Sequence, residues 1–166
     1  MNRRHVFAAG AAVAAALPFA SFAQTAAPAA APADPAKQPA LMGGNFALLS
    51  SRIAADKATA PAVKTFATLE TAEQEAVAMA FGAEPGVGGV SEKHAALLEQ
   101  LQAAPAGPEF DMMYVDGQIA GHEELRTIHA AYAQNGSDPM ARGASMVGVP
   151  SIETHLAMLR GIKQSM

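Results

Sequence analysis

The chain of 166 residues contains no cysteine and no tryptophan, and only 5% of its residues are aromatic. Without a thiol it can form no disulfide, offer no thiolate nucleophile and bind no metal through a cysteine sulfur. Its 11 Lys and Arg residues are outnumbered by 15 Asp and Glu residues, which gives a formal net charge of −4. Because an acidic chain is not attracted to phosphate backbones, we expect no nucleic-acid partner.

Motifs of common enzyme chemistry are also missing. No Gly-x-Ser-x-Gly turn is present, and the stretch GVGG at 86–89 lacks the Lys-Ser or Lys-Thr of a phosphate loop. The nine methionines do not recur at ligand spacing, so core filling explains them better than copper binding. The sequence therefore favours a protein that is not an enzyme, although it leaves enzymatic activity open.

The first 23 residues have the composition of a cleavable export signal. Arg3 and Arg4 precede an alanine-rich apolar stretch over 6–22, and small residues at Ser21 and Ala23 occupy the −3 and −1 positions of a signal peptidase site. Both an ordinary secretory signal and a twin-arginine signal fit this pattern. We therefore expect a periplasmic protein of a bacterial cell, with no stable membrane span once the signal is removed.

The next segment, 24–40, is rich in alanine and proline and contains almost no large apolar residue. Such a segment buries too little surface to offset the entropy lost on ordering, so we expect a disordered tether. The remaining residues, 41–166, have the size of one domain. A chain that begins at Leu41 should then fold as well as the longer one.

Apolar residues in 41–166 recur at helical spacing, and the alternation typical of strands is missing. We expect Thr59 to cap the second helix, and Gly148 with Pro150 to kink or break the last one. The expected helices span about 44–58, 60–81, 92–101, 110–134 and 139–162. Helices of this length joined by short breaks predict an all-α antiparallel bundle.

Carboxylates and imidazoles fall on the inner sides of three of these helices. Helical phase places Asp111 and His122 at the edge of one apolar stripe, and Glu70 and Glu73 share the side of another. His155 lies among apolar residues of the last helix. These five residues are the candidate metal ligands, with Fe, Mn or Zn as the ion. The competing interpretation, which the sequence favours, is a hydrogen-bonded polar edge of the core that binds no cofactor.

Three segments in a fixed order resemble a known family. These are RIAADKATAPAVKTFATLETAEQ, FDMMYVDGQIAGHEEL and VPSIETHLAML, within about 45–163. Together they resemble bacterial exported helical proteins classed as the domain-of-unknown-function family 4142 (DUF4142). The resemblance implies a ferritin-like four-helix bundle and leaves the biochemical activity largely unassigned.

The same resemblance bears on metal chemistry, because helical di-iron sites draw Glu and His ligands from four helices. Here Glu73 and Gln74 stand where relatives have an Asp-His pair, and Ala47 stands near the helix-one Glu. A complete di-iron ligand set is therefore not expected.

Two functions follow from these observations. The first is an envelope-associated binding or structural module that contacts an envelope protein or a small ligand. The alternative is a metal-binding, ferritin-like redox or metal-storage protein.

We predict that the exported protein begins at Gln24, because only there do small residues occupy both recognition positions after the apolar stretch. Mass spectrometry of protein from the periplasmic fraction measures this terminus directly. Recovery of a chain that retains Met1 in the membrane fraction would identify residues 1–23 as an anchor.

Overall fold

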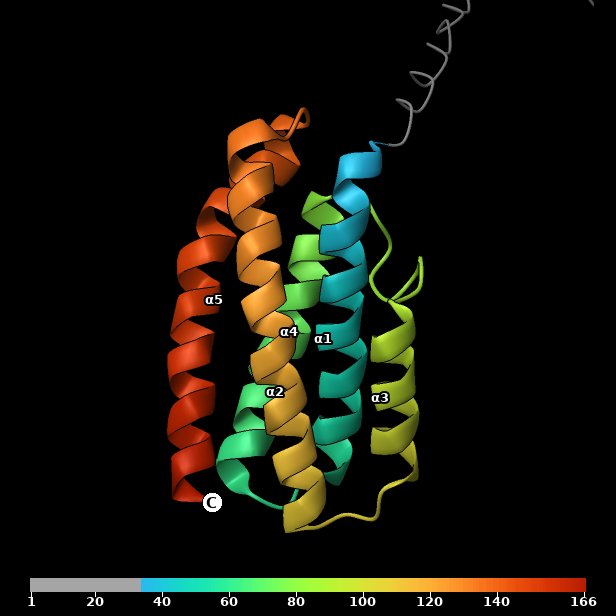
Figure 1. Ribbon diagram of the computed structural model, residues 1–166, viewed down its shortest axis with the longest axis vertical. Coiled ribbons are helices and arrows are strands. Elements are labelled where there is room, and N and C mark those ends of the chain that lie inside the picture. The colour runs from blue at the N-terminus through green and yellow to red at the C-terminus, as the bar shows by residue number, and fades with distance from the viewer. Residues whose placement is uncertain (1–33) are drawn as a thin grey trace, which may run out of the picture. The chain divides into compact units, whose positions relative to one another are not determined.

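The computed structural model describes residues 34–166, which are helical apart from short connections (Figure 1). A short 3-10 helix, η1 (Pro35–Lys37), leads into α1 (Gln38–Lys57), α2 (Pro61–Ala80), α3 (Glu92–Ala103), α4 (Pro108–Asn135) and α5 (Pro139–Ser165). This part of the chain contains no strand, so the predicted all-α class is confirmed. Within the same range, no helix combines the length and the apolar character needed to cross a membrane. The predicted signal at 1–23 lies outside the described residues.

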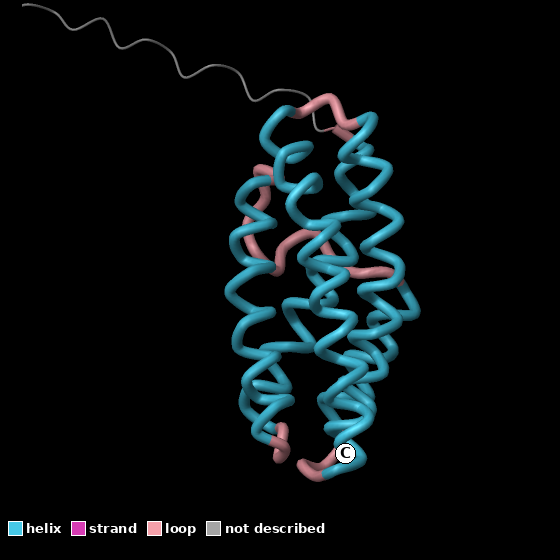
Figure 2. The backbone as a smooth tube through the Cα atoms, turned by 90° about the vertical axis from the view of Figure 1, so that its left-hand side faces the viewer, coloured by secondary structure: helices cyan, strands magenta, loops and turns pink. Residues whose placement is uncertain are grey.

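The helices lie side by side, and successive helices run in opposite directions (Figures 1 and 2). Contacts link α1 to α2, α2 to α5, α5 to α4 and α4 back to α1, while α3 packs on the outside against α1 and α4. The inward faces of α1, α2, α4 and α5 therefore enclose a common interior.

The interior is built from a few large side chains and many alanines. Phe46, Phe66, Phe110 and Tyr114 are at most 1% exposed, and each contributes roughly 1.5–3 kcal/mol through apolar burial. Small residues let the helices approach one another closely. A Cβ atom on Gly121 of α4 would lie 3.1 Å from the Phe46 ring of α1, so a larger residue there would require this ring to shift by a few tenths of an ångström.

The start of α2 corrects the predicted cap. Thr59 does not cap the helix; Ala60 is the N-cap residue and supplies no side-chain hydrogen bond. Asp111 of α4 instead fixes the turn that precedes the helix, because its carboxylate accepts hydrogen bonds from the backbone N–H groups of Thr59 and Ala60 and from the Thr59 hydroxyl. A contact supplied by another helix is invisible to local sequence patterns.

Of the predicted kink or break in the last helix, the structure excludes the break, because α5 continues through Pro150. A proline has no N–H to donate to the carbonyl four residues earlier, which here belongs to Met146. The side chains of Met146 and Val147 are 63% and 70% exposed, so this turn faces solvent. Water can hydrogen-bond the freed carbonyl there, which explains why the helix tolerates the proline.

The predicted tether boundary is wrong for residues 34–40. Helix α1 begins at Gln38 instead of near Gly44, and Ala40 is only 3% exposed. Lys37 lies 2.7 Å from the Asp138 carboxylate and donates to the Phe81 carbonyl. Side-chain ion pairs and hydrogen bonds thus hold a segment that has little apolar surface of its own. Residues 24–33 of the predicted tether lie outside the described residues.

Asp34 strengthens this attachment. Its carboxylate accepts hydrogen bonds from the hydroxyls of Tyr132 and Ser137, at 2.8 and 2.9 Å. The hydrogen bond from Tyr132, followed by that from Ser137, holds the pKa of the Asp34 carboxyl below its usual range.

His129 of α4 is a buried histidine in the same half of the interior. Its Nδ1 atom shares a 3.0 Å hydrogen bond with Ser145 of α5, and its ring meets Phe81 edge to face. Burial lowers the pKa of His129 to about 4. The folded protein therefore binds a proton at His129 much less readily than the unfolded chain does.

We predict that a chain shortened to begin at Leu41 is less stable than one that begins at Ala33. The shortening removes Asp34 and Lys37 with their partly buried partners, so the melting midpoint should fall by more than about 5 °C. Thermal unfolding followed by circular dichroism measures the difference. Equal melting midpoints for the two chains would mean that residues 34–40 do not stabilise the fold, as the prediction of a tether over 24–40 requires.

We also predict that stability falls with acid through His129. Since its folded pKa lies below its unfolded value, the free energy of unfolding should drop by about 2–3 kcal/mol between pH 7.5 and 4.5. Urea unfolding at both pH values tests this in wild type and His129→Asn. The raised pKa of His155 acts in the opposite direction in both proteins, so their difference isolates His129. If the free energy of unfolding depended equally on pH in both proteins, His129 would not be the source of the acid effect.

Candidate metal centre

Three of the five predicted ligands meet in the interior. Glu70 comes from α2, His122 from α4 and His155 from α5, and one potential ligand atom from each lies within 4.8 Å of the other two. Glu70 has no exposed surface, and neither does His122. Helical phase on each segment points these side chains inward, and the packing of the three helices brings them to the same level.

The spacing of the three atoms matches that of ligands around a single ion. Glu70 Oε2 lies 2.9 Å from His155 Nδ1 and 3.4 Å from His122 Nε2, and the two ring nitrogens are 3.3 Å apart. A point equidistant from all three in their plane is about 1.9 Å from each, so an ion with bonds of roughly 2.1 Å would lie just outside that plane. The remaining coordination positions would be left for water or another ligand.

The carboxylate of Glu70 has one occupied and one free oxygen. Gln74, one turn further along α2, donates its amide N–H to Oε1 at 2.9 Å. Oε2 is fully buried and accepts no hydrogen bond, although two imidazole nitrogens lie close to it. A buried carboxylate oxygen without a hydrogen bond is uncommon and calls for a positively charged neighbour.

Each imidazole ring has an acceptor near the nitrogen that faces away from Glu70. His122 Nδ1 lies 2.8 Å from the Gln118 carbonyl, and since a carbonyl oxygen can only accept, Nδ1 carries the hydrogen. His122 Nε2 is therefore the ring nitrogen that faces Glu70, and it is the atom that could bind an ion. On the other ring, His155 Nε2 lies 3.4 Å from a carboxylate oxygen of Glu73. Metal-binding histidines are held as His122 is here, with a hydrogen-bond acceptor at the nitrogen that does not bind the ion.

Charge in the cluster is balanced between the carboxylate and the rings. Burial raises the pKa of Glu70, but the adjacent rings of His122 and His155 outweigh it and lower the pKa to about 2. Glu70 in turn raises the pKa of His155. Glu70 is thus ionised, and in the absence of an ion the Nδ1–H of His155 can donate to His122 Nε2.

Phe66 forms an apolar wall beside the rings. It lies one turn before Glu70 on α2, and its ring meets His155 edge to face at a centroid distance of 5.4 Å. The tilted His122 ring lies 6.0 Å from the same phenyl group. Phe66 therefore restricts both imidazoles while keeping water from this side of the cluster.

Comparison with known families assigns the chain. Residues 18–162 match the family described as Domain of unknown function (DUF4142). The chain belongs to this family. No curated protein and no solved structure matches the chain significantly.

The description of DUF4142 assigns no activity, so the site must be judged on its residues. A di-iron centre does not fit the described residues, because the cluster contains one carboxylate and two imidazoles, and Gln74 beside Glu70 is an amide. One carboxylate and two imidazoles do fit a single ion such as Zn²⁺, Fe²⁺ or Mn²⁺.

The other two predicted ligands lie outside the cluster. Asp111 is only 1% exposed, and its oxygens accept the hydrogen bonds from Thr59 and Ala60 described above, so it stabilises the start of α2. Glu73 contacts the outer nitrogen of His155 and accepts a hydrogen bond from Ser151 of α5.

Sequence reasoning missed the residues that hold the ligands in place. Gln74, Gln118 and Ser151 each lie four residues from a cluster member on the same helix, at Glu70, His122 and His155 respectively. This i, i+4 spacing is a usable signal for such supporting contacts. It cannot tell which member of a pair reaches the ion.

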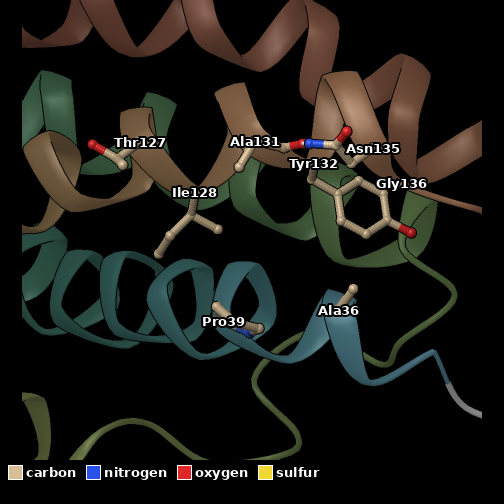
Figure 3. A pocket seen from close by; sticks show the side chains of 8 residues that line it. All are labelled: Ala36, Pro39, Thr127, Ile128, Ala131, Tyr132, Asn135 and Gly136. Carbon is tan, nitrogen blue, oxygen red and sulfur yellow. The ribbon is translucent and has the colours of Figure 1, made fainter.

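A separate pocket lies where α1 begins and α4 ends, and Figure 3 shows its lining. It has a volume of about 380 Å³ and is bounded by residues that include Pro39, Ile128 and Tyr132. The lining contains no carboxylate or imidazole, so this pocket offers no metal site.

Proposed function

We propose that this DUF4142 protein is an exported, envelope-associated helical module that binds one divalent first-row metal ion through Glu70, His122 and His155. The observation that carries the proposal is the convergence of three ligand atoms around a carboxylate oxygen that accepts no hydrogen bond. Export rests on the composition of residues 1–23. We also propose that α1, α2, α4 and α5 form a ferritin-like four-helix bundle, which the ring of contacts among them supports.

A structural or regulatory metal site suits the geometry better than storage. Storage needs space for many ions, whereas the three ligand atoms here lie within 4.8 Å and two of the side chains are fully buried. The three protein ligands leave coordination positions free, which also permits redox chemistry of a bound ion or binding of a small ligand to it. An envelope protein remains a second kind of partner for the exposed helix faces.

We predict that Zn²⁺, Mn²⁺ or Fe²⁺ raises the melting temperature of the metal-free protein saturably. An ion that binds only the folded state at 100 times its Kd stabilises that state by about 2.7 kcal/mol, which is several degrees in a domain of this size. Differential scanning calorimetry with each metal measures the shift. Glu70→Gln, His122→Ala and His155→Ala should each abolish it.

Two buried positions outside the cluster provide matched controls. His129→Asn removes another buried histidine of α4, and Asp111→Asn removes another buried carboxylate. Both variants should melt at lower temperature yet keep the full metal-dependent rise. An unchanged wild-type melt at millimolar metal, or an equal rise in the three cluster variants, would restore the interpretation of a metal-free polar core.

A further inference from the structure

The proposed metal site is closed on its inner side. Gln118, whose carbonyl anchors His122, has no exposed surface, and its amide donates to the hydroxyls of Ser50 and Ser51 of α1. The Ser51 hydroxyl is in turn hydrogen-bonded to the buried Tyr114. An ion has no path to Glu70 through this packed polar network.

His155 is the one cluster residue with appreciable contact to solvent. Its side chain is 12% exposed, against 1% for His122 and none for Glu70. His155 Nε2 lies 3.4 Å from a carboxylate oxygen of Glu73, and the Glu73 side chain is 33% exposed. Glu73 therefore stands between solvent and the one partly exposed residue of the cluster.

A groove between α2 and α5 ends at the same point. It has a volume of about 340 Å³ and is lined by alanine, valine and glycine, with Glu73 and Ser151 as its two polar residues. Since α2 and α5 run in opposite directions, Glu73 and Ser151 lie together at one end of it. The Ser151 hydroxyl donates to Glu73 Oε1 at 2.8 Å and so joins the two helices across the groove.

We propose that Glu73 is the access residue of the metal site: its carboxylate receives a hydrated divalent cation from the α2–α5 groove and passes it to His155. The Ser151 hydroxyl holds this carboxylate in place over the opening. The inference rests on the proposed metal site but goes beyond it, because it assigns Glu73 a role in the rates of loading and release and not in the final coordination.

The geometry separates this role from that of a ligand. Nδ1 and Nε2 lie on different edges of the His155 ring, and Nδ1 faces Glu70 while Nε2 faces Glu73. An ion bound to Nδ1 therefore has the width of the imidazole between itself and Glu73, so the His155 ring must turn for an ion held by Glu73 to reach Nδ1. A group that binds an ion only in transit accelerates uptake and release equally and leaves the equilibrium unchanged.

The test uses Co²⁺ as a coloured probe of the full chain. Stopped-flow absorbance gives the association rate, and a chase with excess chelator gives the dissociation rate. Glu73→Gln should slow both by about tenfold, as expected when a steering charge is lost, and should change Kd by less than about threefold. Glu75→Gln is the matched control, because it removes the same charge from α2 at a residue that pairs with Arg52 and does not line the groove.

Ser151→Ala provides a second, independent variant. Loss of its hydrogen bond frees Glu73, so both rates should rise together at constant Kd. If Glu73→Gln weakens binding through faster dissociation alone, Glu73 is a ligand or a support of His155 and the proposal is overturned. If Glu73→Gln takes up and releases Co²⁺ at the same rates as Glu75→Gln, the access role of Glu73 is overturned as well, while the proposed metal site is unaffected. A wild-type protein that takes up no Co²⁺ refutes both proposals.

Discussion

A fully buried carboxylate is the constraint around which this interior is arranged. Removing a charged Glu70 from water costs several kcal/mol, and the protein offsets this cost only through close partners. Those partners come from three different places: an amide one turn away on α2, an imidazole on α4 and another on α5. The position of each helix relative to the others is thereby tied to a single side chain.

The surrounding composition makes this constraint stricter. A core rich in alanine and glycine lets α1 approach α4 closely, as the contact between Gly121 and Phe46 requires. Close helices leave little room for water, so buried polar groups must satisfy one another. Gln118 does this for Ser50 and Ser51, and the same residue orients His122 through its carbonyl. Packing and site geometry are consequently parts of one network.

The site differs from a di-iron centre in a way that the residues explain. Two bridged ions need several carboxylates, whereas the cluster supplies one, and Gln74 beside Glu70 is an amide. One carboxylate with two imidazoles is a set that borderline metal ions accept. Membership in DUF4142 places the chain in a family without assigned activity, so this ligand set is the chemical feature from which a function can be tested.

Local patterns in the sequence determined the helices and the inward sides of their residues. Ser91 caps α3 and Asp138 caps α5 through their own side chains, because caps and helical phase depend on neighbours within one turn. Three other features depend on partners distant in sequence or on solvent. These are the docking of residues 34–40, the hydrogen bonds that Asp111 accepts just before α2, and the unbroken α5. The site also depends on distant partners: phase made Glu70, Asp111, His122 and His155 equally good candidates. Only the axial register of α2, α4 and α5 brought three of them together, since register is set by packing between helices and not by the periodicity of any one.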